Sequence, residues 1–109
     1  MDRSKGWNPV QFVTHDLVIR PEAEADISDA YQWYEKRRKG LGSDFLLCIE
    51  ATLDSIQRNP KLYQVIHHEV RRAFIRRFPY GIFYLLEDDR IVVLAVFHVR
   101  RDPRSWPNH

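Results

Sequence analysis

The sequence predicts a single α+β domain with two layers, in which a helical hairpin packs on a small, antiparallel-dominated sheet. Three patterns indicate this fold: two adjacent amphipathic helices with a very short link, a change to alternation with period two after them, and a final apolar run of strand length. The expected order of elements is β-α-α-β-β-β. Two helices that share an apolar face must bury it against the only sheet available, which gives a two-layer domain.

The first strand is expected at residues 17–19, a short apolar run that ends at Arg20 and Pro21. Pro21 suits the first position of a helix, because its missing N–H has no helical partner there. Small and apolar side chains then recur at helical spacing, and a run of Lys and Arg before Gly40 marks the end of this helix. Its buried face is expected to contain Ala23, Ile27, Ala30, Tyr31 and Tyr34, whereas Trp33 falls off that face.

A second helix is predicted between Ser43 and Asn59. Ser43 is the expected N-cap, and the helix stops before Pro60 because the residue that precedes a proline avoids helical angles. The link from Gly40 to Gly42 is so short that the two helices must form an antiparallel hairpin. The apolar face of this second helix consists of Phe45, Leu46, Ile49, Leu53 and Ile56.

Residues 61–69 are predicted to form a connecting loop that holds two adjacent histidines, His67 and His68. On a strand these side chains would point to opposite sides, so a shared metal site is not expected. Alternation then predicts a strand over residues 71–78. Its arginines are expected on both faces, with Arg72 and Arg76 on one and Arg71 and Arg77 on the other.

Two more strands are predicted at residues 82–86 and 91–97, joined by a polar turn at residues 87–90. The unbroken apolar run of the last strand indicates a central position, covered on both faces. These strands and the one before them form an antiparallel meander. The first strand must pair with one of them, but periodicity does not say which.

Length and composition bound the class of protein. The chain has 109 residues, 44% of them hydrophobic, 29% charged and 13% aromatic, which is typical of one soluble globular domain. No apolar run reaches the ~20 residues of a membrane span, and no secretory signal is visible, so a cytoplasmic protein without a membrane partner is expected. We expect residues 1–14 to be a leader and residues 15–109 to be the domain. Cys48 is the single cysteine, which excludes an internal disulfide, and neither a metal nor a cofactor is expected.

Charge is unevenly distributed along the chain. Residues 1–58 carry 8 basic and 10 acidic side chains, whereas residues 59–109 carry 9 basic and 5 acidic ones. A cationic carboxyl half suggests an anionic partner, either nucleic acid or an acidic protein. Surplus solvated arginine accounts for the same charge equally well.

At this point the sequence resembles a known family, the RelE/ParE superfamily of toxins from type II toxin–antitoxin modules, often called plasmid-stabilisation proteins. The likeness runs from about Leu17 to Trp106, and the family fold has the element order derived above. It depends on residues in both helices, on an arginine and a Phe-Pro-Tyr stretch before a strand, and on a basic carboxyl end with a tryptophan. These residues are Pro21, Ala23, Asp26, Ile27, Tyr31, Tyr34, Gly42, Phe45, Leu53 to Ile56, Pro60, Arg72, Arg77-Phe78-Pro79-Tyr80-Gly81-Ile82-Phe83-Tyr84, His98-Val99-Arg100-Arg101-Asp102-Pro103 and Trp106.

The resemblance implies one of two activities. RelE-like members are ribosome-dependent endoribonucleases, which use lysines and arginines on the sheet and a tyrosine near the carboxyl end. Here the aromatic residue at that place is Trp106, whose indole N–H only donates, and no lysine follows Lys61. Arginine, with a pKa above ~12, is a poor proton donor. We therefore favour the ParE-like branch, whose members bind and inhibit DNA gyrase and are not enzymes.

Both branches are neutralised by a cognate antitoxin, so the resemblance implies this partner together with gyrase. The alternative partners are the ribosome and mRNA, with Arg72, His98 and Arg100 as the catalytic set, because histidine titrates near neutral pH. A degenerate, non-toxic member is a third possibility, and a dimer or a toxin–antitoxin hetero-oligomer remains open. The expected binding residues are Arg72, Arg76, His98, Arg100, Arg101, Arg104 and Trp106.

Overall fold

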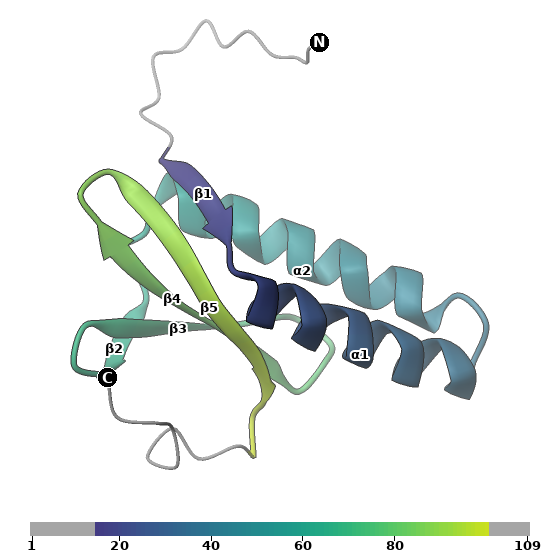
Figure 1. The fold of residues 1–109 in the computed structure, drawn as a ribbon. Coiled ribbons are helices and arrows are strands. Elements are labelled where there is room, and N and C mark those ends of the chain that lie inside the picture. The colour runs from purple at the N-terminus through teal and green to yellow at the C-terminus, as the bar shows by residue number, and fades with distance from the viewer. Residues whose placement is uncertain (1–14, 101–109) are drawn as a thin grey trace, which may run out of the picture.

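The computed structural model describes residues 15–100 and confirms the predicted α+β fold. The two helices lie side by side on one face of a five-stranded sheet (Figure 1). Pairing of the strands is antiparallel except at one edge. The elements are β1 (Asp16–Ile19), α1 (Pro21–Arg37), α2 (Leu41–Arg58), β2 (Gln64–His67), β3 (Val70–Phe74), β4 (Tyr80–Glu87) and β5 (Arg90–His98).

The sheet has the strand order β1-β5-β4-β3-β2, so β3, β4 and β5 form the predicted meander. The first strand, β1, pairs in parallel with β5, which settles the adjacency that periodicity left open. The chain passes directly from β1 into α1, and the Arg20 N–H donates to the Val93 carbonyl at 3.1 Å. Between Phe83 and Tyr84 the register with β5 shifts by one residue, and Leu94 is the extra residue.

The sheet is apolar on both faces. On the helix side it buries Ile82, Tyr84, Ile91, Val93 and Val96 against both helices. We call the opposite side the outer face, and no helical residue belongs to its apolar cluster. Burial of both faces of β5 confirms the central position predicted for residues 91–97. The outer cluster consists of buried Val70, Phe83 and Ala95 with partly buried Ile66, Leu85, Leu94 and Phe97.

The turn between the helices is organised by a carboxylate and two glycines. Gly40 has a φ of +90°, a left-handed conformation that glycine adopts without steric cost. The Glu35 carboxylate accepts the N–H groups of Gly40 and Gly42 at 3.0 and 2.9 Å. The predicted N-cap at Ser43 is wrong, because α2 begins at Leu41 with Gly40 as its N-cap. Glu35 binds these backbone donors, so no cap at Ser43 is needed.

The loop predicted at residues 61–69 contains a strand, and this prediction is therefore wrong. Gln64–His67 forms β2, which pairs with β3 at the edge of the sheet. His68 lies in the turn with a φ of +51°, a left-handed conformation that is uncommon for residues other than glycine. The turn brings the rings of His67 and His68 within 4.2 Å of each other, in contrast to the opposite sides expected for a strand.

The strand predicted over residues 71–78 is shorter than expected. It ends at Phe74, and Arg77 has a φ of +70°, which breaks the alternation. Arg76 and Arg77 consequently lie in the loop between β3 and β4, and Arg72 and Arg76 do not share a strand face. The physical reason is the core, because Ile75 and Phe78 both pack on the helix side, which a straight strand would not allow.

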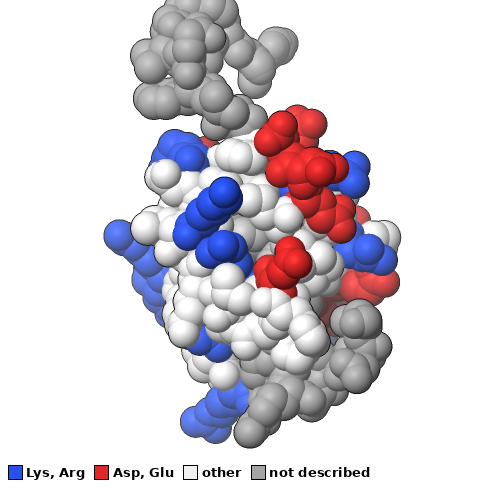
Figure 2. All heavy atoms as spheres, turned by 90° about the vertical axis from the view of Figure 1, so that its left-hand side faces the viewer, with Lys and Arg blue, Asp and Glu red and all other residues white. Residues whose placement is uncertain are grey.

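The charged surface is uneven. Figure 2 shows acidic side chains gathered toward the top of one side of the molecule, while basic side chains lie mainly along its left edge and uncharged atoms fill much of the middle. The turn between β4 and β5 supplies Glu87, Asp88 and Asp89, as the predicted polar turn requires. Within residues 15–100, neither helix has the combination of length and apolarity needed to cross a bilayer.

Candidate functional site

Arg72 lies on the outer face and stacks on an aromatic ring. Its guanidinium carbon is 4.5 Å from the centre of the Phe74 ring, and Phe74 is 56% exposed. The arginine stem passes over Gly81, where an added Cβ would lie 3.1 Å from the Arg72 Cγ. This arrangement presents a cation and an apolar ring together, which suits contact with a protein or a nucleic acid.

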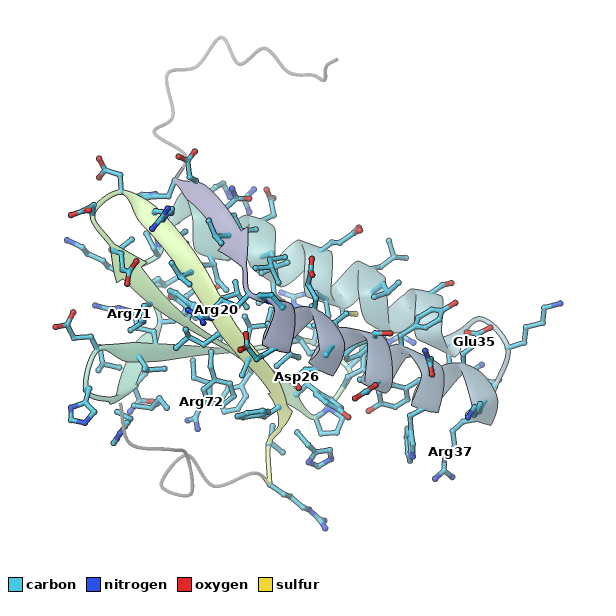
Figure 3. All side chains as sticks on the ribbon, viewed as in Figure 1. Arg20, Asp26, Glu35, Arg37, Arg71 and Arg72 are labelled. Atoms are coloured by element: carbon cyan, nitrogen blue, oxygen red, sulfur yellow. The ribbon has the colours of Figure 1, made fainter. Side chains whose placement is uncertain are left out.

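Arg71 has a structural role on the helix side of the sheet. Figure 3 shows Arg71 and Arg72 on opposite sides of β3. Arg71 donates to the carbonyls of Lys61 and Tyr63 at 3.2 and 2.7 Å, so its guanidinium is held within the fold. Burial raises the pKa of the adjacent Tyr84 to about 12, and the charge of Arg71 only partly opposes this shift.

The exposed arginines Arg76 and Arg100 come from two loops at the same end of the sheet. The Val99 N–H donates to the Pro79 carbonyl at 2.8 Å and thereby joins the segment after β5 to the β3–β4 loop. Arg77 instead faces α2, with its Nη2 at 3.6 Å from the Asp44 Oδ2. The structure therefore brings Arg76 and Arg100 to one end of the sheet and directs Arg77 elsewhere.

His98 ends β5 on the helix side. Its ring centre is 5.4 Å from that of Tyr80, and its Nδ1 accepts the N–H of Arg100 at 3.2 Å. Arg72 lies on the outer face, so the structure does not bring Arg72 and His98 together on one side of the sheet. Only Nε2 of His98 is then available for proton transfer.

A groove of about 550 Å³ lies between part of α1, the start of β4 and the end of β5. Its aromatic floor continues into the core, because the Tyr34 ring lies 4.8 Å from Phe78 and 6.1 Å from Tyr80. Of the residues that line this groove, only His98 was predicted from the sequence to be a binding residue. Trp33 was predicted only to lie outside the buried face of its helix. The groove is lined by Asp26, Asp29, Ala30, Trp33, Tyr34, Pro79, Tyr80, Val96, Phe97 and His98.

The groove has charged groups at its edges. Asp26 faces β5 (Figure 3), and its Oδ2 accepts the Val96 N–H at 3.0 Å. Burial raises the pKa of Tyr80, and the negative charge of Asp26 adds to this shift. Farther along α1, the guanidinium of Arg37 lies 4.0 Å from the centre of the Trp33 ring, and Trp33 is 50% exposed. An exposed tryptophan stacked with arginine is a typical anchor in protein interfaces.

Three of the expected binding residues, Arg101, Arg104 and Trp106, lie outside the described residues, as does the predicted leader at residues 1–14. For metals, residues 15–100 contain no group of three or more His, Cys, Asp or Glu side chains that could hold an ion. The described part of the site thus offers stacked arginine, exposed aromatic rings and a groove.

Comparison with known families decides the identity of the fold. The family model of the ParE toxin of the type II toxin–antitoxin system parDE matches residues 17–103. The chain belongs to the ParE toxin family. A curated relative, the toxin ParE2 of Mycobacterium tuberculosis, is 23% identical over 94 residues, which cover 85% of this chain and 90% of the relative.

Solved structures of toxin–antitoxin systems share this ParE fold. The chromosomal ParDE system from P. aeruginosa superposes with a TM-score of 0.70 at 17% identity, and the match covers 78% of this chain and 96% of that chain. The toxin–antitoxin complex RelBE2 from Mycobacterium tuberculosis gives a TM-score of 0.58 at 17% identity, over 81% and 94% of the two chains. These two structures confirm the α+β fold predicted from the sequence. The family match over residues 17–103 confirms the predicted RelE/ParE superfamily.

Proposed function

We propose that this ParE-family chain is a cytoplasmic toxin that inhibits DNA gyrase by binding to it, and that a cognate antitoxin neutralises it. The observation that carries the proposal is the stack of half-buried Arg72 on the exposed ring of Phe74. Such a pair contributes to binding but supplies no group that titrates near neutral pH.

The arrangement of His98 supports binding over RNA cleavage. Cleavage of RNA without a metal requires a general base, a general acid and positive charge at the phosphate. His98 lies on the other side of the sheet from Arg72, and its Nδ1 is engaged by the backbone of Arg100. A single histidine nitrogen, remote from Arg72, is a poor basis for both proton transfers.

Supercoiling of relaxed plasmid by purified gyrase tests the target. We expect the purified toxin to inhibit supercoiling, and we expect its cognate antitoxin to restore the reaction. Arg72→Gln keeps the aliphatic stem over Gly81 but removes the charge, so it should weaken inhibition. Arg58→Gln, which removes the charge of an exposed arginine at the end of α2, is the matched control and should inhibit like the wild type.

A translation assay with stalled ribosomes distinguishes the alternative. Cleavage of mRNA in the ribosomal A site that is lost in His98→Gln, with gyrase unaffected, would refute the proposal in favour of a ribonuclease. Absence of any growth defect in cells that contain folded toxin without antitoxin would favour a degenerate member.

We further propose that an apolar segment of the antitoxin binds the groove beside α1. The groove offers an aromatic floor at Tyr34 and Tyr80, and half-exposed Trp33 at its edge. An amphipathic segment that inserts apolar side chains into such a groove would leave its acidic residues at the edge, near Arg37. Arg37 would then contribute charge complementarity to the same contact.

Two alanine substitutions, one on each helix, test this contact. Trp33→Ala removes the groove anchor, and we expect antitoxin affinity to fall by about tenfold or more, as for an interface hot spot of ~1.4–2 kcal/mol. Leu47→Ala is the control, because Leu47 is 63% exposed on α2 and does not line the groove. Equal losses for the two variants, measured by calorimetry, would exclude the groove as the antitoxin site.

A further inference from the structure

Three exposed side chains on α1 form a stripe with opposite charges at its two ends. Asp29, Trp33 and Arg37 follow one another at intervals of four residues, so they lie on one face of the helix, about one turn apart. Asp29 and Trp33 line the groove. Arg37 comes next along the helix, and its guanidinium stacks on the Trp33 ring. The groove edge therefore presents an acid, an aromatic ring and a base in this order.

The acidic end of this stripe has no nearby cation in the described part of the chain. Asp26 and Asp29 both line the groove, and of the described residues that line it with them none is Lys or Arg. Asp26 has a structural role, because its Oδ2 accepts the Val96 N–H at 3.0 Å. Asp29 is exposed and forms no ion pair with another residue of the range 15–100. Its carboxylate is therefore available to a cation from a partner.

Aromatic rings in the same groove also suit a cationic side chain. Trp33 is half-exposed, and the partly buried Tyr80 ring lies with its centre 5.4 Å from that of His98. A Lys or Arg side chain is attracted to the face of a Trp or Tyr ring within ~6 Å of the ring centre. Its aliphatic stem packs on apolar surface while its charged head reaches a carboxylate. The groove offers both kinds of contact, with Asp29 at its edge.

We propose that this end of the groove is a subsite for a Lys or Arg side chain of the antitoxin, which pairs with Asp29 among the aromatic rings. The inference rests on the proposed antitoxin site and adds the order of charges on the bound segment: a basic residue, an apolar residue, then an acidic residue near Arg37. Asp29 and Arg37 are eight residues apart, or ~12 Å along α1. The two charged residues of the antitoxin are then about eight positions apart in a helix, or about four in an extended segment.

The order of charges fixes the direction of the segment along the groove. The apolar contacts with Trp33 alone would allow the segment to bind in either direction. A reversed segment would place its acidic residue at Asp29 and its basic residue at Arg37, and contacts between like charges oppose binding. Asp29 therefore selects one orientation, and Arg37 selects the same one.

Charge reversal at Asp29 tests the subsite with the full chain and its full-length cognate antitoxin. Glu50→Lys is the matched control, because Glu50 is exposed on α2 and does not line the groove. We expect calorimetry at low salt to show about tenfold weaker binding for Asp29→Lys, with the difference shrinking as salt increases, and binding within about twofold of the wild type for Glu50→Lys. Both variants add the same charge, so a change in overall attraction would affect them equally. Equal affinities of the two variants would overturn the inference.

The Trp33→Ala variant separates failure of this inference from failure of the proposed antitoxin site. A loss of affinity in Trp33→Ala but not in Asp29→Lys would keep the groove as the antitoxin site and refute the basic subsite. Self-association of the wild-type chain without antitoxin, abolished by Asp29→Lys, would assign the subsite to a basic residue of a second copy and also refute the proposal.

A double-mutant cycle identifies the basic residue of the antitoxin. Asp29→Asn keeps the size of the side chain, so it remains usable if Asp29→Lys does not fold. Each Lys and Arg of the antitoxin is replaced by Gln and combined with this variant. We expect one of these residues to lose its contribution to affinity when Asp29 is already Asn. Independent effects for every Lys and Arg of the antitoxin would overturn the proposal.

Discussion

Glu35 holds the start of α2 through the backbone of Gly42, whose N–H donates to the Glu35 Oε1 at 2.9 Å. The other carboxylate oxygen accepts the Gly40 N–H at 3.0 Å. A side chain in the last turns of α1 thereby binds the N–H groups that the first turn of α2 leaves without helical partners. One residue thus fixes the geometry of the helical hairpin.

The Glu35 contacts should make stability depend on pH. The backbone hydrogen bonds from Gly40 and Gly42 lower the pKa of Glu35 below its usual 4.5. Because the pKa of Glu35 is lower in the folded state than in the unfolded chain, its ionised form stabilises the folded state above pH 4.5. This stabilisation is lost as the pH falls through the pKa that Glu35 has in the folded state. We expect Glu35→Gln to have a lower Tm than the wild type at pH 7, with the difference shrinking in acid. A difference in Tm that is the same at pH 7 and pH 3 would contradict this role.

Gly42→Ala should destabilise the domain by about 1–3 kcal/mol, the usual cost of overpacking. An added Cβ would lie 2.7 Å from the Tyr31 ring carbons and 2.8 Å from its carbonyl oxygen, and the backbone oxygen cannot rotate away. Ser43→Ala is the matched control on the next residue. Because Ser43 is not the N-cap, its loss should cost less than ~0.5 kcal/mol, whereas a true cap would cost ~1 kcal/mol. Urea denaturation measures both values.

The sequence was sufficient to predict both helices, the meander and the two-sided burial of β5, because each depends on local periodicity. The end of β3 was not predictable in this way. The period-two pattern predicts a strand that continues to residue 78, with Ile75 and Phe78 on opposite faces. Both side chains instead pack in the helix-side core, and the positive φ of Arg77 breaks the alternation between them. Tertiary packing overrides the local pattern there.

The second missed element, β2, shows a different limit. Its turn consists of His68 and Glu69 and contains no Gly, Asn or Asp to mark a hairpin. For the site, the arginines were visible as residue types, but Arg71 and Arg72 look alike in sequence. Only the carbonyl partners of Arg71 reveal that it is structural. The groove was missed because its residues come from α1, β4 and β5.

Tyr84→Phe should destabilise the domain by about 1–3 kcal/mol, because it leaves the Pro60 carbonyl without its buried donor. The Tyr84 hydroxyl donates to this carbonyl at 2.6 Å. The pKa of Tyr84 is raised to about 12, so the unfolded chain ionises first and stability falls as the pH rises from 10 to 12. The variant should show a smaller loss of Tm in this range. An identical alkaline slope for the two proteins would contradict the assignment.

Variants of Arg71 and Arg72 should have different effects, one on the stability of the fold and the other on binding. Arg71→Ala removes two hydrogen bonds to the carbonyls of Lys61 and Tyr63, so we expect a lower Tm. Arg72→Gln keeps the packing over Gly81 and should leave the Tm within a few degrees of the wild type, because surface substitutions usually change stability by less than ~0.5 kcal/mol. Under the proposed function, its affinity for gyrase should instead fall by about tenfold, or ~1.4 kcal/mol. Thermal unfolding and surface plasmon resonance on both variants check the pair, and reversed effects would show that Arg72, not Arg71, supports the fold.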